Sequence, residues 1–277
     1  MKRAAIEIYK NIVGNAEYTF KKLNYPADEL VVLCMHSTPC DHQHKFELIL
    51  DFLLKHFTIL DPNQIDEYYQ GNLKNGPYLL FTFDDGLKNN LYAAQLLEKR
   101  GLRAMFFIVP EFIRSNDQKT FYIKNIRPIT DPSFDKEPED FVAMSFDDLR
   151  TLQSSGHIIG SHTSCHTLNR DMNKIQIENE IIQSKDAIMS ELKIEPTSFC
   201  SINNTTVSVN SIAKKMIAEN YRFHFTTFPG LNSTSKESQI IFRRNIEVNW
   251  PLGKIKFSLG QVDLARWSDE IRRFRAL

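Results

Sequence analysis

The sequence predicts an α/β fold in which helices cover a mainly parallel sheet. Short apolar runs rich in β-branched residues alternate with longer segments of helical periodicity along most of the chain. Such alternation is typical of strand–helix units and of a parallel sheet. Because about seven of these units follow one another within 277 residues, we expect one barrel or distorted barrel rather than two domains.

The predicted strands are short apolar runs. The longest, residues 31–35 and 78–83, are almost continuously apolar, as expected of strands that are buried on both faces. Pro110 ends the run that begins at Arg103. In order, the predicted strands are residues 31–35, 57–60, 78–83, 103–109, 158–159, 198–202 and 222–226.

Segments of helical periodicity fill most of the intervals between these strands. Ser145 can cap a helix whose first turn contains Asp147 and Asp148, and a helix that begins at Leu87 ends before Gly101. The predicted helices are residues 46–56, 87–100, 145–155, 173–192, 208–220 and 262–274.

Residues 111–144 interrupt the alternation of strands and helices. They are rich in Asp, Pro and Lys and predict an inserted loop, and long loops of this kind often shape a binding site. No composition shift marks a domain boundary elsewhere, so we expect a single domain over residues 1–277.

Composition argues against several classes of protein. Lys and Arg number 34 and Asp and Glu also number 34, a balance that is unusual for a general nucleic-acid or membrane-surface binder. No apolar run approaches the roughly 18 residues of a membrane span. Charged and polar residues such as Glu7 and Lys10 interrupt the N-terminal segment, which makes it a poor secretory signal. We therefore expect a cytoplasmic protein with reduced thiols.

Polar residues with catalytic potential lie at the ends of four predicted strands. In parallel βα folds, the C-terminal ends of the strands form one edge of the sheet, and ligands bind there. We therefore expect these side chains to gather in one place. They are His36, Asp84, Asp85, His162, His166 and His224.

Two histidines and two adjacent aspartates have the composition of a catalytic metal site. The four-residue spacing of His162 and His166 places both imidazoles on one face of a helical turn. Asp84 and Asp85 would ionise unequally unless a cation intervened, so one can ligate a metal ion while the other remains free as a base. Two histidines and one carboxylate, with positions left for water, are typical of a catalytic divalent site. Taken alone, each motif is also compatible with a surface turn.

The segment 82–86, TFDDG, resembles the first motif of the polysaccharide deacetylase family, which is also called the NodB-homology domain or carbohydrate esterase family 4. The segment 162–166, HTSCH, is similar to the second motif, and the order and gap of the motifs also fit. The resemblance covers about residues 31–248 and points to a cytoplasmic member that acts in surface-polysaccharide biosynthesis. It implies a distorted (β/α)7 barrel.

The same resemblance implies roles for the motif residues. Asp85, His162 and His166 would ligate Zn²⁺ or a similar divalent ion, and Asp84 would be the general base. A metal ion lowers the pKa of bound water and polarises an acyl carbonyl, so these roles are chemically consistent.

The sequence departs from the family pattern in its third motif. Thr167 also stands where the second motif usually has proline. The segment 199–204 lacks the Arg and Pro of the third motif, whose Arg orients the base. Arg243 or Arg244, in a strand-like segment, could replace it from another strand end. In this interpretation Arg244 orients the base and Arg243 contacts the substrate.

The general acid and the remaining substrate contacts have weaker signals. The late Leu-x-x-His motif that often supplies the acid is absent, which leaves His36 and His224 as candidates. Asn203 and Asn204 could donate hydrogen bonds to the oxyanion or the sugar, and Trp250 could stack on a sugar face.

The sequence therefore predicts a metal-dependent hydrolase that removes an N-acyl group from an amino sugar. Acetyl is the expected group and formyl the second candidate. Because no export signal is recognised, we expect a small glycan on a nucleotide or lipid carrier. Specific arginines would have to bind the phosphate of that carrier. The candidates are Arg243, Arg244 and the C-terminal cluster of Arg266, Arg272, Arg273 and Arg275.

Two other functions use part of the same residue set. A non-catalytic, metal-containing sugar-binding protein would explain the missing third-motif Arg and late His, although it has no need of a free base at Asp84. An Fe(II) oxygenase also uses two histidines and one carboxylate, but the parallel βα pattern does not favour it.

Overall fold

A computed structural model describes residues 2–127, 138–203, 205–232 and 239–277. Within these residues nine strands form a single sheet: β1 (Leu30–Met35), β2 (Thr58–Ile59), β3 (Tyr78–Phe83), β4 (Met105–Ile108), β5 (Ile158–Ser161), β6 (Ser198–Cys200), β7 (Phe223–Phe225), β8 (Ile240–Ile241) and β9 (Arg243–Asn245). The strand order is β8-β7-β6-β5-β4-β3-β1-β9, and β2 pairs with the start of β3. All of these strand pairs are parallel.

The last two strands close this sheet into a barrel. Only Phe242 separates β8 from β9, yet β8 pairs with β7 while β9 pairs with β1, at the opposite end of the strand order. The two short strands therefore act as one interrupted strand, and the barrel has seven positions, with β2 as an addition beside β3. The predicted distorted (β/α)7 barrel is confirmed.

The side chain of Asn232 holds this seam together. The N–H of Phe242 donates to Asn232 Oδ1 at 2.9 Å, and Asn232 Nδ2 donates to the carbonyls of Phe242 at 2.9 Å and Leu30 at 3.0 Å. Its own N–H donates to the carboxylate of Glu29. One buried amide thus satisfies backbone groups that the break at Phe242 leaves outside the strand pairing.

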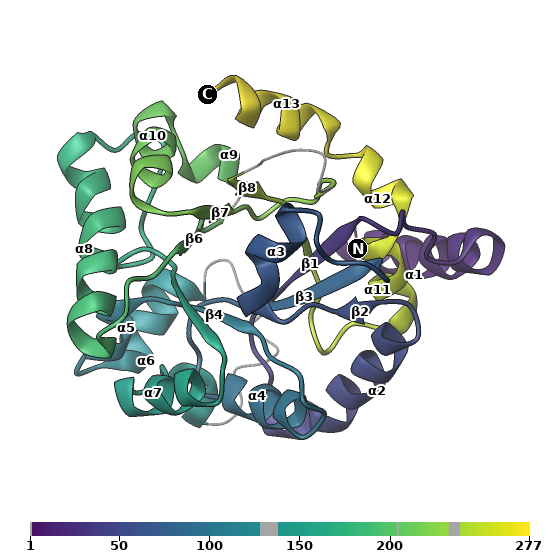
Figure 1. The fold of residues 1–277 in the computed structure, drawn as a ribbon, viewed down its shortest axis with the longest axis horizontal. Helices are drawn as coiled ribbons and strands as arrows, with labels where there is room; N and C mark the ends of the chain where they lie inside the picture. The colour runs from purple at the N-terminus through teal and green to yellow at the C-terminus, as the bar shows by residue number, and fades with distance from the viewer. Residues whose placement is uncertain (1, 128–137, 204, 233–238) are drawn as a thin grey trace.

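Helices surround the barrel (Figure 1). They are α1 (Lys2–Lys21), α2 (Gln43–Leu54), α3 (Ile65–Tyr69), α4 (Asn90–Glu98), α5 (Pro110–Arg114), α6 (Gln118–Phe121), α7 (Phe146–Ser154), α8 (Lys174–Leu192), α9 (Thr205–Ser208), α10 (Ser211–Asn220), α11 (Leu252–Leu259), α12 (Gln261–Ala265) and α13 (Ser268–Ala276). Ser145 caps α7 in a capping box with Asp148. Among the described helices, none is both long enough and apolar enough to cross a bilayer.

Most predicted elements are present, with bounds that differ by a few residues. The predicted helices 208–220 and 262–274 are each divided in two, into α9 and α10 and into α12 and α13. The segment 111–144 is not simply a loop, since its described part contains most of α5, all of α6, a π-helical turn at Tyr122–Ile126 and a 3-10 turn at Pro138–Phe141.

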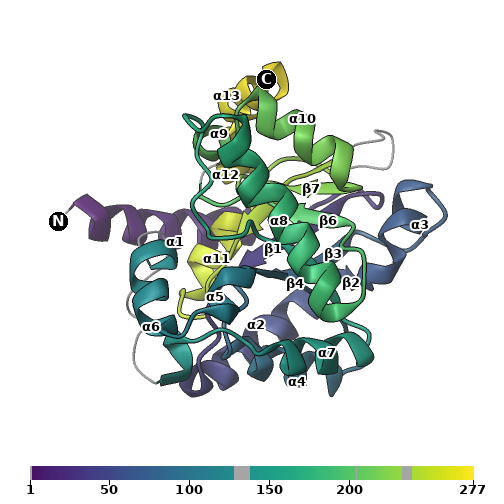
Figure 2. The ribbon, with the colours of Figure 1, turned by 90° about the vertical axis from the view of Figure 1, so that its left-hand side faces the viewer.

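Two helices that the sequence analysis did not predict, α1 and α11, pack against each other. Their backbones lie close together at Gly14 and Gly253, where a Cβ added to Gly14 would lie 1.9 Å from the carbonyl oxygen of Gly253. Glycine at this position therefore permits backbone contact that a side chain would prevent. The N-terminal end of α1 projects from the body of the molecule (Figure 2).

Side-chain alternation determines which residues face the inside of the barrel. Val32, Leu80, Phe107 and Phe225 belong to one apolar cluster that fills the interior. Their neighbours along each strand face the other way and pack under the helices, as Phe81 does. The residues two positions after Leu80 and Val32 are Thr82 and Cys34, which lie on the same inward side and carry polar groups. The interior of the barrel is therefore apolar at its base and polar at the C-terminal ends of its strands.

We expect Asn232→Ala to lower the free energy of unfolding by about 3 kcal/mol, because the buried N–H of Phe242 and two carbonyls lose their partners. Denaturant unfolding measures the change. Asn72→Ala, at an exposed position, is the control. Equal stability of the two variants would show that the seam does not depend on this amide.

Candidate active site

A buried ion pair between Asp84 and Arg243 occupies the C-terminal end of the barrel. Nη1 and Nη2 of Arg243 donate to Oδ1 and Oδ2 of Asp84, both at 2.7 Å. The other N–H groups donate to Thr82 Oγ1 at 2.9 Å, the carbonyl of Thr226 at 2.7 Å and Cys200 Sγ at 2.8 Å. Because a guanidinium has five N–H groups, every one of them has an acceptor.

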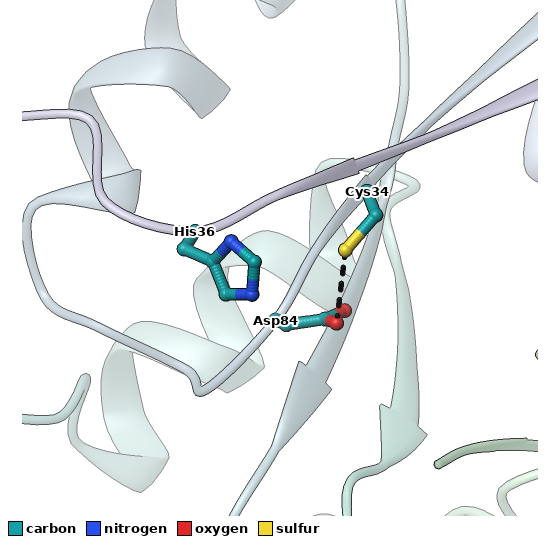
Figure 3. A group of neighbouring side chains, drawn as sticks. All are labelled: Cys34, His36 and Asp84. Atoms are coloured by element: carbon teal, nitrogen blue, oxygen red, sulfur yellow. Dashed lines mark hydrogen bonds between the residues drawn. The ribbon is translucent and has the colours of Figure 1, made fainter. Parts of the chain in front are cut away.

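This ion pair keeps Asp84 ionised. Burial by itself would raise the pKa of Asp84, but the Arg243 guanidinium outweighs burial and holds the pKa well below its usual range. Two thiols also contact Asp84 Oδ2. Cys34 lies at 3.3 Å (Figure 3) and Cys200 at 3.6 Å. Burial raises the pKa of both thiols well above its ordinary value, so they remain protonated donors.

Asp85, His162 and His166 form a second cluster beside this ion pair. Asp85 Oδ1 lies 3.5 Å from His162 Nε2 and 3.4 Å from His166 Nε2, and all three residues are buried. Both carboxylate oxygens of Asp85 and Nε2 of His166 have no hydrogen-bond partner. Converging, buried and unpaired ligand atoms are costly unless a cation binds them. The cluster therefore fits a divalent metal ion.

Backbone carbonyls determine which nitrogen each imidazole presents to this cluster. Nδ1 of His162 lies 3.0 Å from the carbonyl oxygen of Cys200, and Nδ1 of His166 lies 2.8 Å from that of Asn125. Since a carbonyl only accepts, each Nδ1 carries the proton and each Nε2 is free to ligate. Burial lowers the pKa of His166, which favours the neutral ligand form.

Asn125 belongs to the segment 111–144, which therefore orients a candidate ligand. The composition of this segment predicts that it shapes the site, but it does not identify Asn125. Its contribution is a backbone carbonyl, which any residue type supplies, so no side-chain signal marks the position.

Left-handed backbone conformations aim the candidate ligands. Asp85 and Gly86 have φ angles of 72° and 70°, so the turn after β3 directs two consecutive carboxylates into one region. A Cβ on Gly86 would lie 3.1 Å from Ile108. Thr163, with φ of 68°, is a β-branched residue in a conformation that costs about 1–3 kcal/mol. Its hydroxyl accepts the N–H of His166, which stabilises this turn.

His36 lies beside Asp84 (Figure 3). A hydrogen bond to Glu247 orients its ring. Nδ1 of His36 is 2.6 Å from Glu247 Oε1. Burial lowers the pKa of His36, but the Glu247 carboxylate outweighs burial and raises it to about 10. The side chain is 19% exposed and can therefore meet a ligand. Glu247 lies just beyond β9 in no recognised motif, so the sequence does not predict its role.

Arg243, and not Arg244, holds the candidate base, and neither arginine is placed to contact a substrate. Arg243 holds Asp84 and is fully buried, so it does not offer its guanidinium to a substrate. Arg244 points to the outer face of the barrel, where Nη1 donates to the carbonyls of Ser258 and Gly260. The physical reason is alternation, because adjacent residues of a strand point to opposite faces.

His224 lies away from both clusters. It faces the helices rather than the barrel interior, its Nε2 is 2.5 Å from Ser201 Oγ, and its ring packs edge-on against Phe199 and Phe274. Burial lowers its pKa to about 3, so the ring is neutral. This geometry is that of a core histidine and does not support the expectation of a general acid.

Among the described residues, the remaining predicted substrate contacts belong to neither cluster. Asn203 is exposed on the turn after β6, with φ of 53°. Trp250 is half-buried, and the ammonium of Lys254 lies 3.6 Å from the centroid of its ring. Asn204 lies outside the described residues.

The model of the family called polysaccharide deacetylase matches residues 72–219, just over half of the chain. The chain belongs to this family. A search of curated proteins finds no match.

Several solved structures share the barrel of this deacetylase-family chain. The Streptococcus pyogenes deacetylase PplD, in complex with acetate, is 13% identical with a TM-score of 0.62, and the match covers 85% of this chain and 100% of that one. IcaB from Ammonifex degensii is 17% identical with a TM-score of 0.64, covering 83% and 97%. The BpsB deacetylase domain from Bordetella bronchiseptica is 16% identical with a TM-score of 0.61, covering 81% and 98%. At these identities the similarity shows the fold.

A buried glutamate supports the second motif of this deacetylase-family chain. Thr167, which stands where the family usually has proline, donates its hydroxyl to Glu180 Oε1 at 2.6 Å. The N–H groups of Thr167 and Cys165 donate to Glu180 Oε2 at 3.4 and 3.2 Å. Glu180, on α8, therefore fixes the backbone on both sides of His166.

We expect Glu180→Gln to weaken metal binding by about tenfold or more, because an amide cannot accept all three hydrogen bonds that position His166. Titration with Zn²⁺ measures the dissociation constant. Glu178→Gln, on the same helix with an exposed side chain near Lys174, is the matched control. Equal affinities for the two variants would contradict the role of Glu180.

The raised pKa of His36 predicts a pH dependence of stability for the metal-free protein. A histidine with a pKa of about 10 when folded and 6.5 when unfolded binds more protons in the folded state between these values. Its contribution is complete below pH 6.5 and is lost as the pH rises toward 10. In Glu247→Gln the decline should be shallower, as measured by denaturant unfolding over this pH range, with the exposed Glu219→Gln as control. A decline as steep as that of the unmodified protein would refute the coupling.

Proposed function

We propose that this protein is a metal-dependent hydrolase that removes an N-acyl group from an amino sugar. The observation that carries the proposal is that the two adjacent carboxylates, Asp84 and Asp85, have different surroundings and can take different roles. Arg243 holds the first as an ionised base, while the second converges with two imidazoles on a space that fits a cation. Family membership supports deacylation of a carbohydrate. Acetyl is the expected group, as the acetate complex of PplD also suggests, and formyl is the second candidate.

Asp85, His162 and His166 would hold the metal ion. Two imidazoles and one carboxylate suit Zn²⁺ and leave positions for water and substrate. When bound, the ion would supply a Lewis acid that lowers the pKa of a water molecule and polarises the acyl carbonyl.

Asp84 would accept the proton of the attacking water. Arg243 and the two thiols contact Asp84 Oδ2, whereas Oδ1 accepts only one hydrogen bond, from Arg243. Oδ1 can therefore accept a further hydrogen bond from a water molecule. The bidentate ion pair also fixes the direction of the carboxylate, which general-base catalysis requires.

His36 would protonate the departing amine. Glu247 takes the hydrogen bond of Nδ1, so Nε2 is the position from which a proton can be donated. When water adds to the carbonyl carbon and the C–N bond breaks, the nitrogen needs a proton in order to leave as an amine. The pair of Asp84 and His36 provides both proton transfers.

The charge distribution bears on the substrate. Arg243 and Arg244 are buried and bound within the protein, so neither is placed to receive a carrier phosphate. In the C-terminal cluster three arginines lie near an acidic residue three positions earlier: Arg266 near Asp263, Arg272 near Asp269 and Arg273 near Glu270. These contacts favour an uncharged glycan over the expected nucleotide- or lipid-linked sugar. A cytoplasmic location and a role in surface-polysaccharide biosynthesis stay predictions.

The alternative of a non-catalytic sugar-binding protein loses its main support. It rested on the missing third-motif Arg and the missing late His. Arg243 contacts the carboxylate that such an Arg would orient, and His36 lies beside the same carboxylate.

We expect Asp84→Asn to lose more than about a hundredfold in turnover while it retains metal binding. The assay is release of acetate or formate from acylamino sugars and their oligomers, together with measurement of bound metal. Because the substitution leaves the Arg243 charge unpaired, it should also lower the free energy of unfolding. The double variant Asp84→Asn with Arg243→Met should recover part of this stability.

Three outcomes would contradict these assignments. Full activity of Asp84→Asn would exclude Asp84 as the base. Unchanged metal affinity of Asp85→Ala or His162→Ala would exclude the proposed ligands. Absence of turnover by the unmodified, metal-loaded protein across the whole panel would favour the sugar-binding protein.

A further inference from the structure

Three side chains beside the candidate base, Cys34, His36 and Asp84, have the composition of another metal site. Cys34 lies on β1, His36 follows that strand, and Asp84 follows β3. One ligand atom of each residue lies within 4.8 Å of the other two, and Figure 3 shows the three side chains together. This set, which we call the Cys34 group, shares no residue with the cluster around Asp85.

The spacing of the Cys34 group suits a four-coordinate metal ion. Bonds of about 2.3 Å to sulfur and about 2.0–2.1 Å to nitrogen or oxygen place tetrahedral ligand atoms about 3.3–3.6 Å apart. Cys34 Sγ already lies 3.3 Å from Asp84 Oδ2, and the thiol proton is directed at this oxygen. A metal ion can take the place of that proton with little movement of either side chain.

Glu247 orients His36 in the way that a carboxylate orients a metal-binding histidine. Nδ1 of His36 is engaged by Glu247 Oε1 at 2.6 Å, which leaves Nε2 for a ligand. Metal-binding histidines usually donate their other ring N–H to a carboxylate or a carbonyl. The side chain of His36 is also partly exposed, which gives an ion a route to the buried thiol.

A divalent ion can enter the Cys34 group without a change in buried charge. In the metal-free protein Arg243 balances Asp84. Protonated His36 balances Glu247. The ion forms bonds to sulfur, nitrogen and oxygen, while the Cys34 thiol and the His36 imidazolium each lose one proton to solvent. Because two positive charges enter and two leave, the site avoids the cost of an uncompensated buried charge.

Cys200, the other thiol that contacts the base, is less suitable as a ligand. It belongs to a similar set of side chains, but its sulfur accepts an N–H of Arg243 at 2.8 Å, and this guanidinium would repel a cation there. The histidine of that set, His162, already belongs to the cluster around Asp85. We therefore assign the ligating thiol to Cys34.

We propose that the Cys34 group is a second metal site, which binds a thiophilic divalent ion and thereby inhibits the protein. A thiolate ligand selects Zn²⁺ or Cd²⁺ over Mg²⁺ or Ca²⁺. The bound ion occupies both the candidate base, Asp84, and the candidate acid, His36, so it blocks both proton transfers. Binding of the ion is independent of the proposed function, whereas inhibition rests on it.

Titration with Cd²⁺ tests the site, because a thiolate bound to Cd²⁺ absorbs in the ultraviolet and the cluster around Asp85 contains no sulfur. In protein that carries one equivalent of Zn²⁺, a further equivalent of Cd²⁺ should produce this absorption. Asp85→Ala should retain it, and so should Cys40→Ser, the control at an exposed thiol. Cys34→Ser should lose it, since a serine hydroxyl can donate to Asp84 but supplies no sulfur.

Glu247→Gln provides a second test that leaves every ligand of the Cys34 group in place. It should weaken Cd²⁺ binding by about tenfold or more, because His36 loses the carboxylate that orients it. The exposed Glu219→Gln is the matched control. Equal Cd²⁺ affinities for the two variants would show that His36 is not a ligand.

Inhibition is measured as release of acetate or formate, with Zn²⁺ added beyond the first equivalent. Turnover of the unmodified protein should fall at least about tenfold, whereas Cys34→Ser should keep the turnover that it has with one equivalent. Unchanged turnover of the unmodified protein in excess Zn²⁺ would refute inhibition.

The absorption separates this inference from the proposed function. Absorption without turnover on any acylamino sugar would support the Cys34 group and not the hydrolase. Turnover without absorption would leave the hydrolase intact and overturn the second site. Absorption that persists in Cys34→Ser and disappears in Cys200→Ser would also overturn the assignment.

Discussion

The ion pair between Asp84 and Arg243 is the interaction on which the rest of the site depends. Arg243 begins β9, the strand that closes the barrel, and its guanidinium reaches groups at the ends of β3, β6 and β7. A buried ion pair is favourable only when its other hydrogen-bonding positions are satisfied, and every N–H of Arg243 has an acceptor. Closure of the barrel and orientation of the candidate base are therefore achieved by the same side chain.

The same ion pair separates the roles of two adjacent carboxylates. The charge of Asp84 is compensated by a guanidinium. Asp85 instead faces the Nε2 atoms of two imidazoles, and its carboxylate oxygens have no hydrogen-bond partner, so they are available for a cation. The left-handed turn at Asp85 and Gly86 makes this possible, since an extended strand would direct the two side chains to opposite faces. Chemical difference between identical residue types thus comes from backbone conformation and neighbouring charge.

The fold and the convergence of Asp85, His162 and His166 could be predicted, because strand ends of a parallel sheet meet and the motif residues follow those ends. Side-chain direction within a strand could not: Arg243 and Arg244 exchange roles if the register shifts by one residue, and composition does not fix the register. Glu180 and Asn125 act on His166 from distant segments, one through a backbone carbonyl, and neither contact has a sequence signal. Helix α1 was missed because charged residues interrupt it and its contact with α11 depends on glycine.

The site is divided between two parts of the chain. The cluster of Asp85, His162 and His166 lies within residues 72–219, which the family model matches, whereas His36, Arg243 and Glu247 lie outside them. The topology explains how both parts meet: β1 pairs with β3 on one side and with β9 on the other, so side chains from β9 and the ends of these strands reach Asp84 across a single strand. In a closed barrel the ring of strand ends offers several positions around one carboxylate. An arginine or histidine that is absent from its usual motif can therefore be supplied from another strand with the same effect on the base.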